Sequence, residues 1–239
     1  MALLDQYYSG DKSLIRIAPE QASRFAKDVA TDFNPIHDED SKRFCVPGDL
    51  IFAVVLAKQG VYKDMTFEFK GMMGKGIETC FRYTSPDSLE IIDDNGKVYL
   101  GVSYNGEHST NPDLIHNLTC SYVRFSGNNF PHLLLPLMQE KKVMINPNRP
   151  LIIYQSMSIH LDQLTIEKPE LEITESSLEV DGKRGNVHLE FCIKSCGEKI
   201  GHGDKNLVLS GLRAYDHDVL MDLINFHLER KRVYQANGH

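Results

Sequence analysis

The strongest constraint on the fold is an apolar run from Leu50 to Ala57, in which every side chain is hydrophobic. Such a run must be buried on all sides, whether it forms a helix or a strand. Ala53 and Ala57 favour a helix, and Lys58-Gln59-Gly60 ends the run with a glycine stop. We therefore expect a central helix that other elements enclose.

The composition is that of a globular chain of 239 residues, 41% hydrophobic and 25% charged. The net charge of -7 argues against a nucleic acid partner, because a phosphate-binding surface needs clustered excess Lys and Arg. No apolar run approaches the length of a membrane span, and the first residues lack the layout of a secretory signal. We therefore expect a cytoplasmic protein with no membrane partner.

The five cysteines are scattered and odd in number, which predicts no disulfide framework. Neither the cysteines nor the histidines have the spacing of metal ligands. We expect no metal site and no organic cofactor.

A helix followed by several strands occurs twice, which predicts two domains of one architecture, residues 1–126 and 127–239. Pro19 opens a helix in the first domain, where its missing N–H costs nothing. The strands of this domain are predicted at 13–17, 65–70, 76–84, 88–92, 97–104 and 114–125.

The second domain is predicted to begin with a short apolar helix at 132–142. Its strands are expected at 151–159, 170–180, 186–195 and 199–209, before a last helix at about 216–231. The core face of that last helix is predicted to hold Val219, Leu220, Leu223, Ile224 and Leu228. The fold class is α+β.

Asp32 and His37 flank a rigid turn in which Pro35 fixes the backbone and extends Asn34. A carboxylate and an imidazole across such a turn can converge on one small molecule such as water, and His is suited to moving a proton near neutral pH. Gly48 adds a backbone N–H at the start of the buried helix, where the helix dipole favours negative charge. Acid, base and oxyanion donor are what adding water to an activated double bond requires.

A simpler reading stays open for these six residues alone. Asp-x-Asn-Pro is a common turn sequence, so Asp32 would only cap the turn and His37 would be an exposed loop residue.

The stretch from Leu14 to Ile77 resembles the MaoC-like family, which includes (R)-specific enoyl-CoA hydratases with a hot-dog fold. The resemblance is carried by Ser23-Arg24-Phe25-Ala26, by Asp32-Phe33-Asn34-Pro35-Ile36-His37-Asp38, and by Gly48 at the start of the central helix. It implies a double hot-dog, with two antiparallel sheets that each wrap a central helix. The second half has no such motif, so the resemblance makes it the non-catalytic partner.

The resemblance also implies the roles of the site residues. His37 would be the general base, Asp32 would order the water, Asn34 would shape the loop and the Gly48 N–H would bind the thioester carbonyl. Substrate contacts are expected from four neighbours of these residues: Phe33, Pro47, Asp49 and Phe52.

The chain departs from the family pattern near the central helix. Pro47 stands where the family has His, and Asp49 puts a carboxylate close to the expected oxyanion. The link from Gly60 to Asp64 is short, which predicts a short acyl chain or a closed pocket.

The resulting hypothesis is an acyl-thioester hydratase or dehydratase, a lyase acting on an enoyl-CoA or an enoyl acyl carrier protein. A non-catalytic acyl-thioester-binding protein and a thioesterase are the alternatives. A monomeric double hot-dog and a homodimer are both compatible with the sequence.

Overall fold

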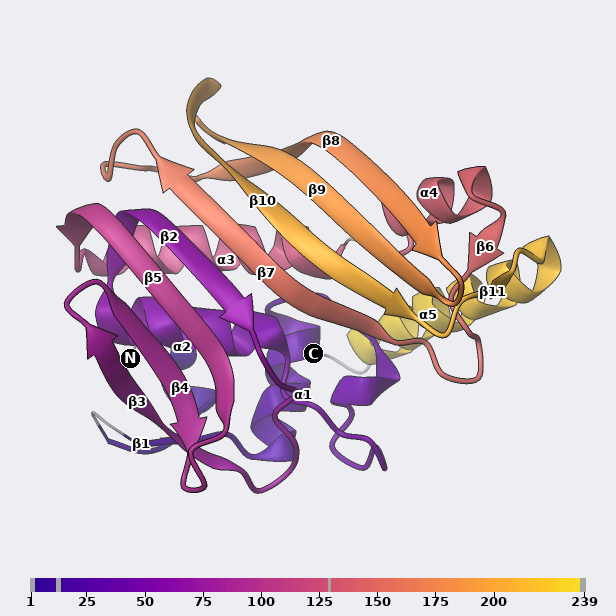
Figure 1. Cartoon of the computed structure of the whole chain (residues 1–239), viewed down its shortest axis with the longest axis horizontal. Helices are drawn as coiled ribbons and strands as arrows, with labels where there is room; N and C mark the ends of the chain where they lie inside the picture. The colour runs from indigo at the N-terminus through magenta and orange to yellow at the C-terminus, as the bar shows by residue number, and fades with distance from the viewer. Residues whose placement is uncertain (1–2, 12–13, 129, 237–239) are drawn as a thin grey trace.

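The computed structural model describes residues 3–11, 14–128 and 130–236 (Figure 1). The elements of the first half are η1 (Leu3–Gln6), β1 (Leu14–Arg16), α1 (Pro19–Asp28), η2 (Pro35–His37), α2 (Gly48–Gln59), β2 (Val61–Phe69), β3 (Glu78–Ser85), β4 (Ser88–Asp93) and β5 (Val98–Ser109). Those of the second half are α3 (Pro112–Gly127), α4 (Leu134–Glu140), β6 (Val143–Met144), β7 (Ile152–Leu161), β8 (Glu170–Asp181), β9 (Arg184–Ser195), β10 (Glu198–Ser210), β11 (Arg213–Ala214) and α5 (His217–Ala236).

Within the described residues, nine strands form one antiparallel sheet in the order β1-β3-β4-β5-β2-β7-β10-β9-β8. In the view of Figure 1, α2 and α3 lie behind this sheet, and α5 lies near one end of β8, β9 and β10. Strands β6 and β11 form a separate small pair. The molecule is thus a mixed α/β protein with a large antiparallel sheet and a C-terminal helix.

Helix α2 lies at the centre of the first half, and the predicted helix over the apolar run is confirmed. The eight residues from Asp49 to Leu56 are all buried, whereas Ala57 at the end of the run is exposed, so the expected burial does not extend to that residue. Phe52 packs on Phe67 of β2 on one side and on Tyr122 of α3 on the other, with ring centroids 5.1 and 4.6 Å apart. Gly60 ends the helix with a φ of 80°, a conformation that glycine adopts without strain.

The two halves repeat one topology. The four strands after α2 are arranged β3-β4-β5-β2, and the four long strands after α3, β7 to β10, are arranged β8-β9-β10-β7. The first strand of each set lies in the middle of the sheet, where β2 pairs with β7 from Asp64 opposite His160 to Glu68 opposite Ser156. The prediction of two separate sheets is therefore wrong, because each half presents an unpaired strand edge and the two edges satisfy each other.

Residues 114–125 were predicted to form a strand, and the structure corrects this to helix α3. Asn111 caps the helix by accepting the Asp113 N–H at 2.9 Å, and Pro112 is its first residue. Leu114, Leu118 and Tyr122 are buried at a spacing of four, which is the helical period. The cap and the spacing were both legible in the sequence, but the β-branched and aromatic residues of this segment favoured a strand.

The C-terminal helix was predicted correctly, with one error on its core face. Leu220 and Ile224 are buried in the core of the second half, and Val219 and Leu223 pack against that core. Leu228 is 44% exposed. Beyond Ile224 the helix leaves this core and contacts the first half through a different face, so Leu228 points outward.

Arg230 joins α5 to the loop after α1. Its guanidinium donates two hydrogen bonds to the Asp38 carboxylate, at 2.7 and 2.8 Å, and one to the Phe33 carbonyl at 3.2 Å. Lys27 of α1 also pairs with Asp38, at 3.0 Å. Asp38 therefore ties together the first helix, the loop and the last helix.

No helix of the described chain is both long and apolar enough to span a membrane.

The Arg230→Met substitution is expected to lower the free energy of unfolding by about 1 to 2 kcal/mol, because a partly buried bidentate pair is lost while Lys27 still compensates Asp38. Chemical denaturation measures the change. Arg232→Met is the matched control: Arg232 is 71% exposed and pairs with Glu229 three residues earlier on the same helix, so its loss should have a much smaller effect than the loss of Arg230. Equal effects of the two substitutions would show that α5 is not held by Asp38.

Candidate functional site

The loop that follows α1 is shaped by side chains bonded to nearby backbone N–H groups. Oδ1 of Asp32 accepts the Asn34 N–H at 2.8 Å, and Oδ1 of Asn34 accepts the Ile36 N–H at 3.2 Å. Pro35 then starts the short helix η2. These contacts leave Oδ2 of Asp32 directed toward His37. Asn34 thus bonds within the loop, and it also lines the cavity described below.

Gly127 allows α3 to approach this loop closely. A Cβ atom at this position would lie 1.8 Å from the Ala30 carbonyl oxygen and 3.4 Å from the Asp32 nitrogen. Only glycine therefore permits the end of α3 to pack against the segment that leads into Asp32.

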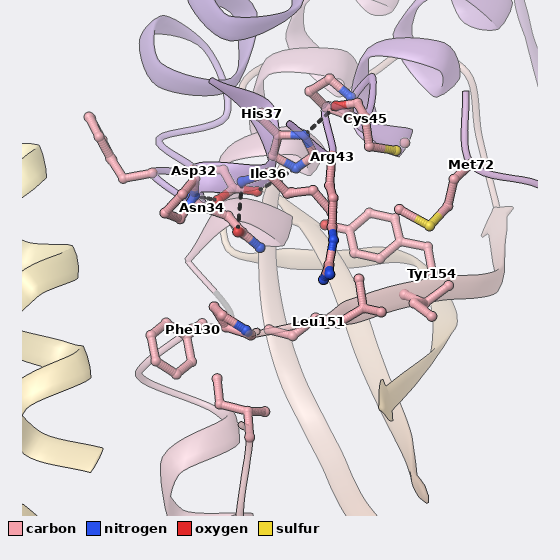
Figure 2. A pocket seen from close by; sticks show the side chains of 18 of the residues that line it. Asp32, Asn34, Ile36, His37, Arg43, Cys45, Met72, Phe130, Leu151 and Tyr154 are labelled. Atoms are coloured by element: carbon pink, nitrogen blue, oxygen red, sulfur yellow. Dashed lines mark hydrogen bonds and ion pairs between the residues drawn. The ribbon is translucent and has the colours of Figure 1, made fainter. Parts of the chain in front are cut away.

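His37 has one ring nitrogen committed and the other directed at Asp32. Its Nδ1 lies 2.7 Å from the Cys45 carbonyl oxygen, and its Nε2 lies 3.5 Å from Oδ2 of Asp32 (Figure 2). A carbonyl oxygen only accepts, so Nδ1 must carry a proton. In neutral His37 the Nε2 therefore carries a lone pair and faces a carboxylate oxygen. Because both atoms are hydrogen-bond acceptors, a proton or a water molecule must lie between them.

Asp32 and His37 each stabilise the charged form of the other. Burial opposes protonation of His37, but the hydrogen bond and charge of Asp32, with the Cys45 carbonyl, outweigh it and raise the pKa of His37. Burial likewise opposes ionisation of Asp32, but His37 and the Asn34 N–H outweigh it and lower the pKa of Asp32. The stabilising effect of Asp32 is lost as pH falls through its depressed pKa, and that of His37 is lost as pH rises through its elevated pKa.

The start of helix α2 faces the same cavity as this pair. The Gly48 and Asp49 N–H groups belong to the first turn of the helix. N–H groups in a first turn have no intrahelical acceptor, and they lie at the positive end of the helix dipole. A Cβ on Gly48 would lie 2.9 Å from the Tyr154 ring and 3.0 Å from the Phe69 ring. Glycine is therefore required for these two rings to close over the helix start.

Asp49 is turned away from the expected oxyanion position. It is 3% exposed, and its Oδ2 accepts hydrogen bonds from Ser126 Oγ at 2.7 Å and from Tyr154 Oη at 3.1 Å. Lys205 is fully buried and donates to the same Ser126 hydroxyl. Asp49 is thus not a helix cap but part of a buried polar network.

Three members of that network, Ser126, Tyr154 and Lys205, were missed in the sequence. One signal could have found Lys205, because it occupies an inward position of β10, in alternation with Gly203 and Leu207. A lysine in such a position needs a buried partner.

A cavity of about 940 Å³ joins these groups. Asp32, His37, Gly48 and Asp49 line one part of it, as do Ser126 and Tyr154. Figure 2 places Phe130 and Leu151 across the cavity from the Asp32–His37 pair, and Arg43 extends into it. Both halves of the chain supply the rest of the wall. The second half contributes apolar side chains that include Leu134, Ile145, Leu207 and Leu223.

The prediction of a closed pocket is therefore wrong. Strand β2 starts at Val61, directly after Gly60, so the link after α2 contributes nothing to the cavity. Residues of the second half, including several of α5, supply much of the apolar wall instead. Among them is His227, which lines the cavity and whose pKa is lowered by burial.

The expected substrate contacts are divided between the cavity and the core. Pro47 and Asp49 line the cavity. Phe33 lines it too, while its ring packs edge-on against His227 and Tyr234 of α5. Phe52 is corrected to a core residue: it is fully buried between Phe67 and Tyr122 and does not line the cavity.

Among the residues that the structure describes, no group of three or more His, Cys, Asp or Glu side chains is arranged to hold a metal ion.

The fold and site define an α/β protein with a large antiparallel sheet and a cavity that holds a His–Asp pair. The chain belongs to the family described as "Protein of unknown function (DUF3581)", whose model matches residues 1–218. None of the curated protein sequences matches this chain.

Several solved structures are similar to this one at low sequence identity. A conserved protein of unknown function with a hot dog fold from Alicyclobacillus acidocaldarius is 8% identical, with 90% of this chain and 100% of that chain covered and a TM-score of 0.46. An acyl-CoA thioesterase II from Mycobacterium marinum is 10% identical, with 71% and 90% covered and a TM-score of 0.43. A MaoC-like dehydratase is 11% identical, with 86% and 99% covered and a TM-score of 0.42. At these identities and TM-scores, the similarities carry no conclusion about activity.

The Asp32→Asn substitution is expected to lower the pKa of His37 below its wild-type value, because burial then acts without the opposing carboxylate. Titration of the His37 ring protons by NMR measures the change. Asp94→Asn, in the exposed turn between β4 and β5, is the control and should leave the His37 titration as in the wild type. An unchanged titration in Asp32→Asn would mean that the two side chains are not paired in solution.

Proposed function

We propose that this protein is an acyl-thioester hydratase or dehydratase, which adds water across the 2,3 double bond of an enoyl-CoA or an enoyl acyl carrier protein. One observation carries the proposal: Nε2 of His37 and Oδ2 of Asp32 lie 3.5 Å apart on the wall of a cavity that also contains the start of α2. Base, carboxylate and oxyanion donor thus meet at one space.

The chemistry follows from the hydrogen-bonding state of His37. Because Nδ1 donates to Cys45, Nε2 is free to take a proton from a water molecule that Asp32 also holds. The hydroxyl adds to C3 of the enoyl group, and electrons move through C2 to the thioester oxygen. The Gly48 N–H and the helix dipole stabilise that oxygen.

A proton must then return to C2, and the newly protonated His37–Asp32 pair is the proposed donor. The overall step consumes one water molecule, forms a C–O bond and a C–H bond, and changes no oxidation state of the protein. No metal or organic cofactor takes part in it. The raised pKa of His37 makes its imidazole a stronger base than an ordinary histidine.

The cavity suits an acyl group. Its apolar wall lies opposite the polar pair, and its volume of about 940 Å³ is at the upper end of the range for small-molecule sites. We therefore propose an acyl chain that extends toward Leu134 and Leu223, rather than the short chain expected from the sequence.

We further propose that the fold is a double hot-dog whose two sheets are fused into one. The repeated strand order supports this reading, with β2 and β7 adjacent at the centre. It also moves the division between the halves from residue 126 to a point before α3, since α3 is the helix of the second repeat. The fused sheet favours a monomeric double hot-dog over the homodimer.

A thioesterase is the second candidate, because water activated by His37 could instead attack the thioester carbonyl beside Gly48. The products would then be a free acid and a free thiol. A non-catalytic binding protein would keep the cavity and release neither product.

The test is the loss of enoyl absorbance when the protein is mixed with trans-2-enoyl-CoA substrates of increasing chain length. His37→Gln and Asp32→Asn are each expected to reduce kcat by about 10² to 10⁴-fold, because general acid–base catalysis contributes that much. A thiol reagent in parallel reactions detects hydrolysis.

His116→Ala, at an exposed position on α3 away from the cavity, is the matched histidine control and should keep the wild-type rate. Hydration that persists at the wild-type rate in His37→Gln would exclude this site, and thiol release without hydration would favour the thioesterase.

A further inference from the structure

Lys205 is a fully buried cation in the middle of strand β10. Its ammonium donates a hydrogen bond to Ser126 Oγ and lies 3.7 Å from the centroid of the Tyr154 ring. The Tyr122 ring is also near, with its centroid 5.6 Å from the ammonium. A buried ammonium is costly unless an opposite charge compensates it.

Asp49 supplies that opposite charge through Ser126. An ammonium only donates, so Ser126 Oγ accepts from Lys205 and its own hydrogen is free for Oδ2 of Asp49, at 2.7 Å. Tyr154 Oη donates to the same oxygen at 3.1 Å. Oδ1 of Asp49 is buried with no hydrogen-bond partner among the described residues. One carboxylate oxygen is therefore fully bonded. Burial raises the pKa of Asp49, and the charge of Lys205 with the hydrogen bonds from Ser126 and Tyr154 opposes that rise, so the ionised carboxylate depends on Lys205.

This network lies directly behind the start of α2. Asp49 follows Gly48 in the chain, and Asp49, Ser126 and Tyr154 all line the cavity. An uncompensated carboxylate here would repel the negative charge that a thioester oxygen gains during reaction, and the repulsion would be strong because water is excluded. Asp32 adds a second carboxylate nearby, since its charge also acts on Lys205.

We propose that Lys205 is a positioning residue of the site: held by Ser126, its charge offsets Asp49, so that the N–H groups at the start of α2 remain able to receive the negative charge of an acyl-thioester oxygen. The proposal rests on the proposed function in one respect, the thioester class of the ligand. Lys205 itself does not line the cavity, so its effect on the site is exerted through Asp49.

The network gives the site a pH dependence of its own. Burial lowers the pKa of Lys205 to about 8, although Asp49 and Asp32 oppose this change. Tyr122 and Tyr154 are the other titratable groups that face the ammonium, and burial raises the pKa of both well above its ordinary value. Lys205 should therefore lose its charge as pH rises through about 8, so activity should decline on the alkaline side as the compensation of Asp49 is lost.

The experiment compares Lys205→Met, Asp49→Asn and the double variant that carries both changes. Lys205→Met should reduce kcat for enoyl-CoA hydration by about 100-fold, the usual effect of weakening an oxyanion site, with a much smaller change in KM. Removing the carboxylate as well should restore the rate to nearly that of Asp49→Asn alone. Lys199→Met, at an exposed position of the same strand, is the control.

A second readout needs no turnover. Acetoacetyl-CoA absorbs differently as ketone and as enolate, so a site that stabilises a thioester enolate raises the enolate band on binding. The wild type should raise this band, Lys205→Met should not, and the double variant should raise it again. If Lys205→Met does not fold, the pH profiles of the wild type and of Asp49→Asn are compared across about pH 8. The wild type should lose activity and the enolate band on the alkaline side, and Asp49→Asn should not; equal profiles would overturn the role of Lys205.

The outcomes separate this proposal from the proposed function. Equal rates of enoyl-CoA hydration by the wild type and by Lys205→Met, with the same pH profile, would overturn the role of Lys205 alone. A wild type that hydrates nothing but shows the Lys205-dependent enolate band would overturn the hydratase and keep the role of Lys205. Neither activity nor an enolate band would overturn both.

Discussion

The burial of helix α2 on every side is the constraint on which the rest of the structure depends. An apolar helix cannot face water, so the sheet covers one side through Phe67 and α3 covers the other through Tyr122. The same burial removes water from the first turn of α2. The N–H groups of that turn have no intrahelical acceptor, and Gly48 and Asp49 line the cavity, so the positive end of the helix dipole lies beside it.

A buried helix start that is to receive negative charge is a poor place for a carboxylate, yet Asp49 lies there. The structure meets this conflict with a second buried charge, Lys205, linked to Asp49 through Ser126. Asp32 has its own partner in His37, so the two carboxylates beside the start of α2 are each matched by one basic group. Charge balance of this kind leaves the cavity free for a ligand that becomes negative during reaction.

The local features were predictable from the sequence, and the long-range features were not. The central helix followed from its uniform apolarity, and the convergence of Asp32 and His37 followed from the rigid turn at Pro35. The fused sheet was not predictable, because the pairing of β2 with β7 joins segments far apart in the chain. Lys205 approaches Asp49 only through tertiary packing, and the cavity wall combines residues of both halves. The spacing of residues in the sequence therefore predicts neither the proximity of Lys205 to Asp49 nor the composition of the cavity wall.

The central claim is that Asp32, His37 and the start of α2 act together on water and an enoyl thioester. Turnover in deuterated water tests it most directly, with the acyl-CoA products analysed by mass spectrometry. The account predicts a 3-hydroxyacyl-CoA that carries one solvent deuteron at C2, and no such product from His37→Gln. Free coenzyme A with an unlabelled acid, or recovery of the enoyl-CoA unchanged, would contradict it.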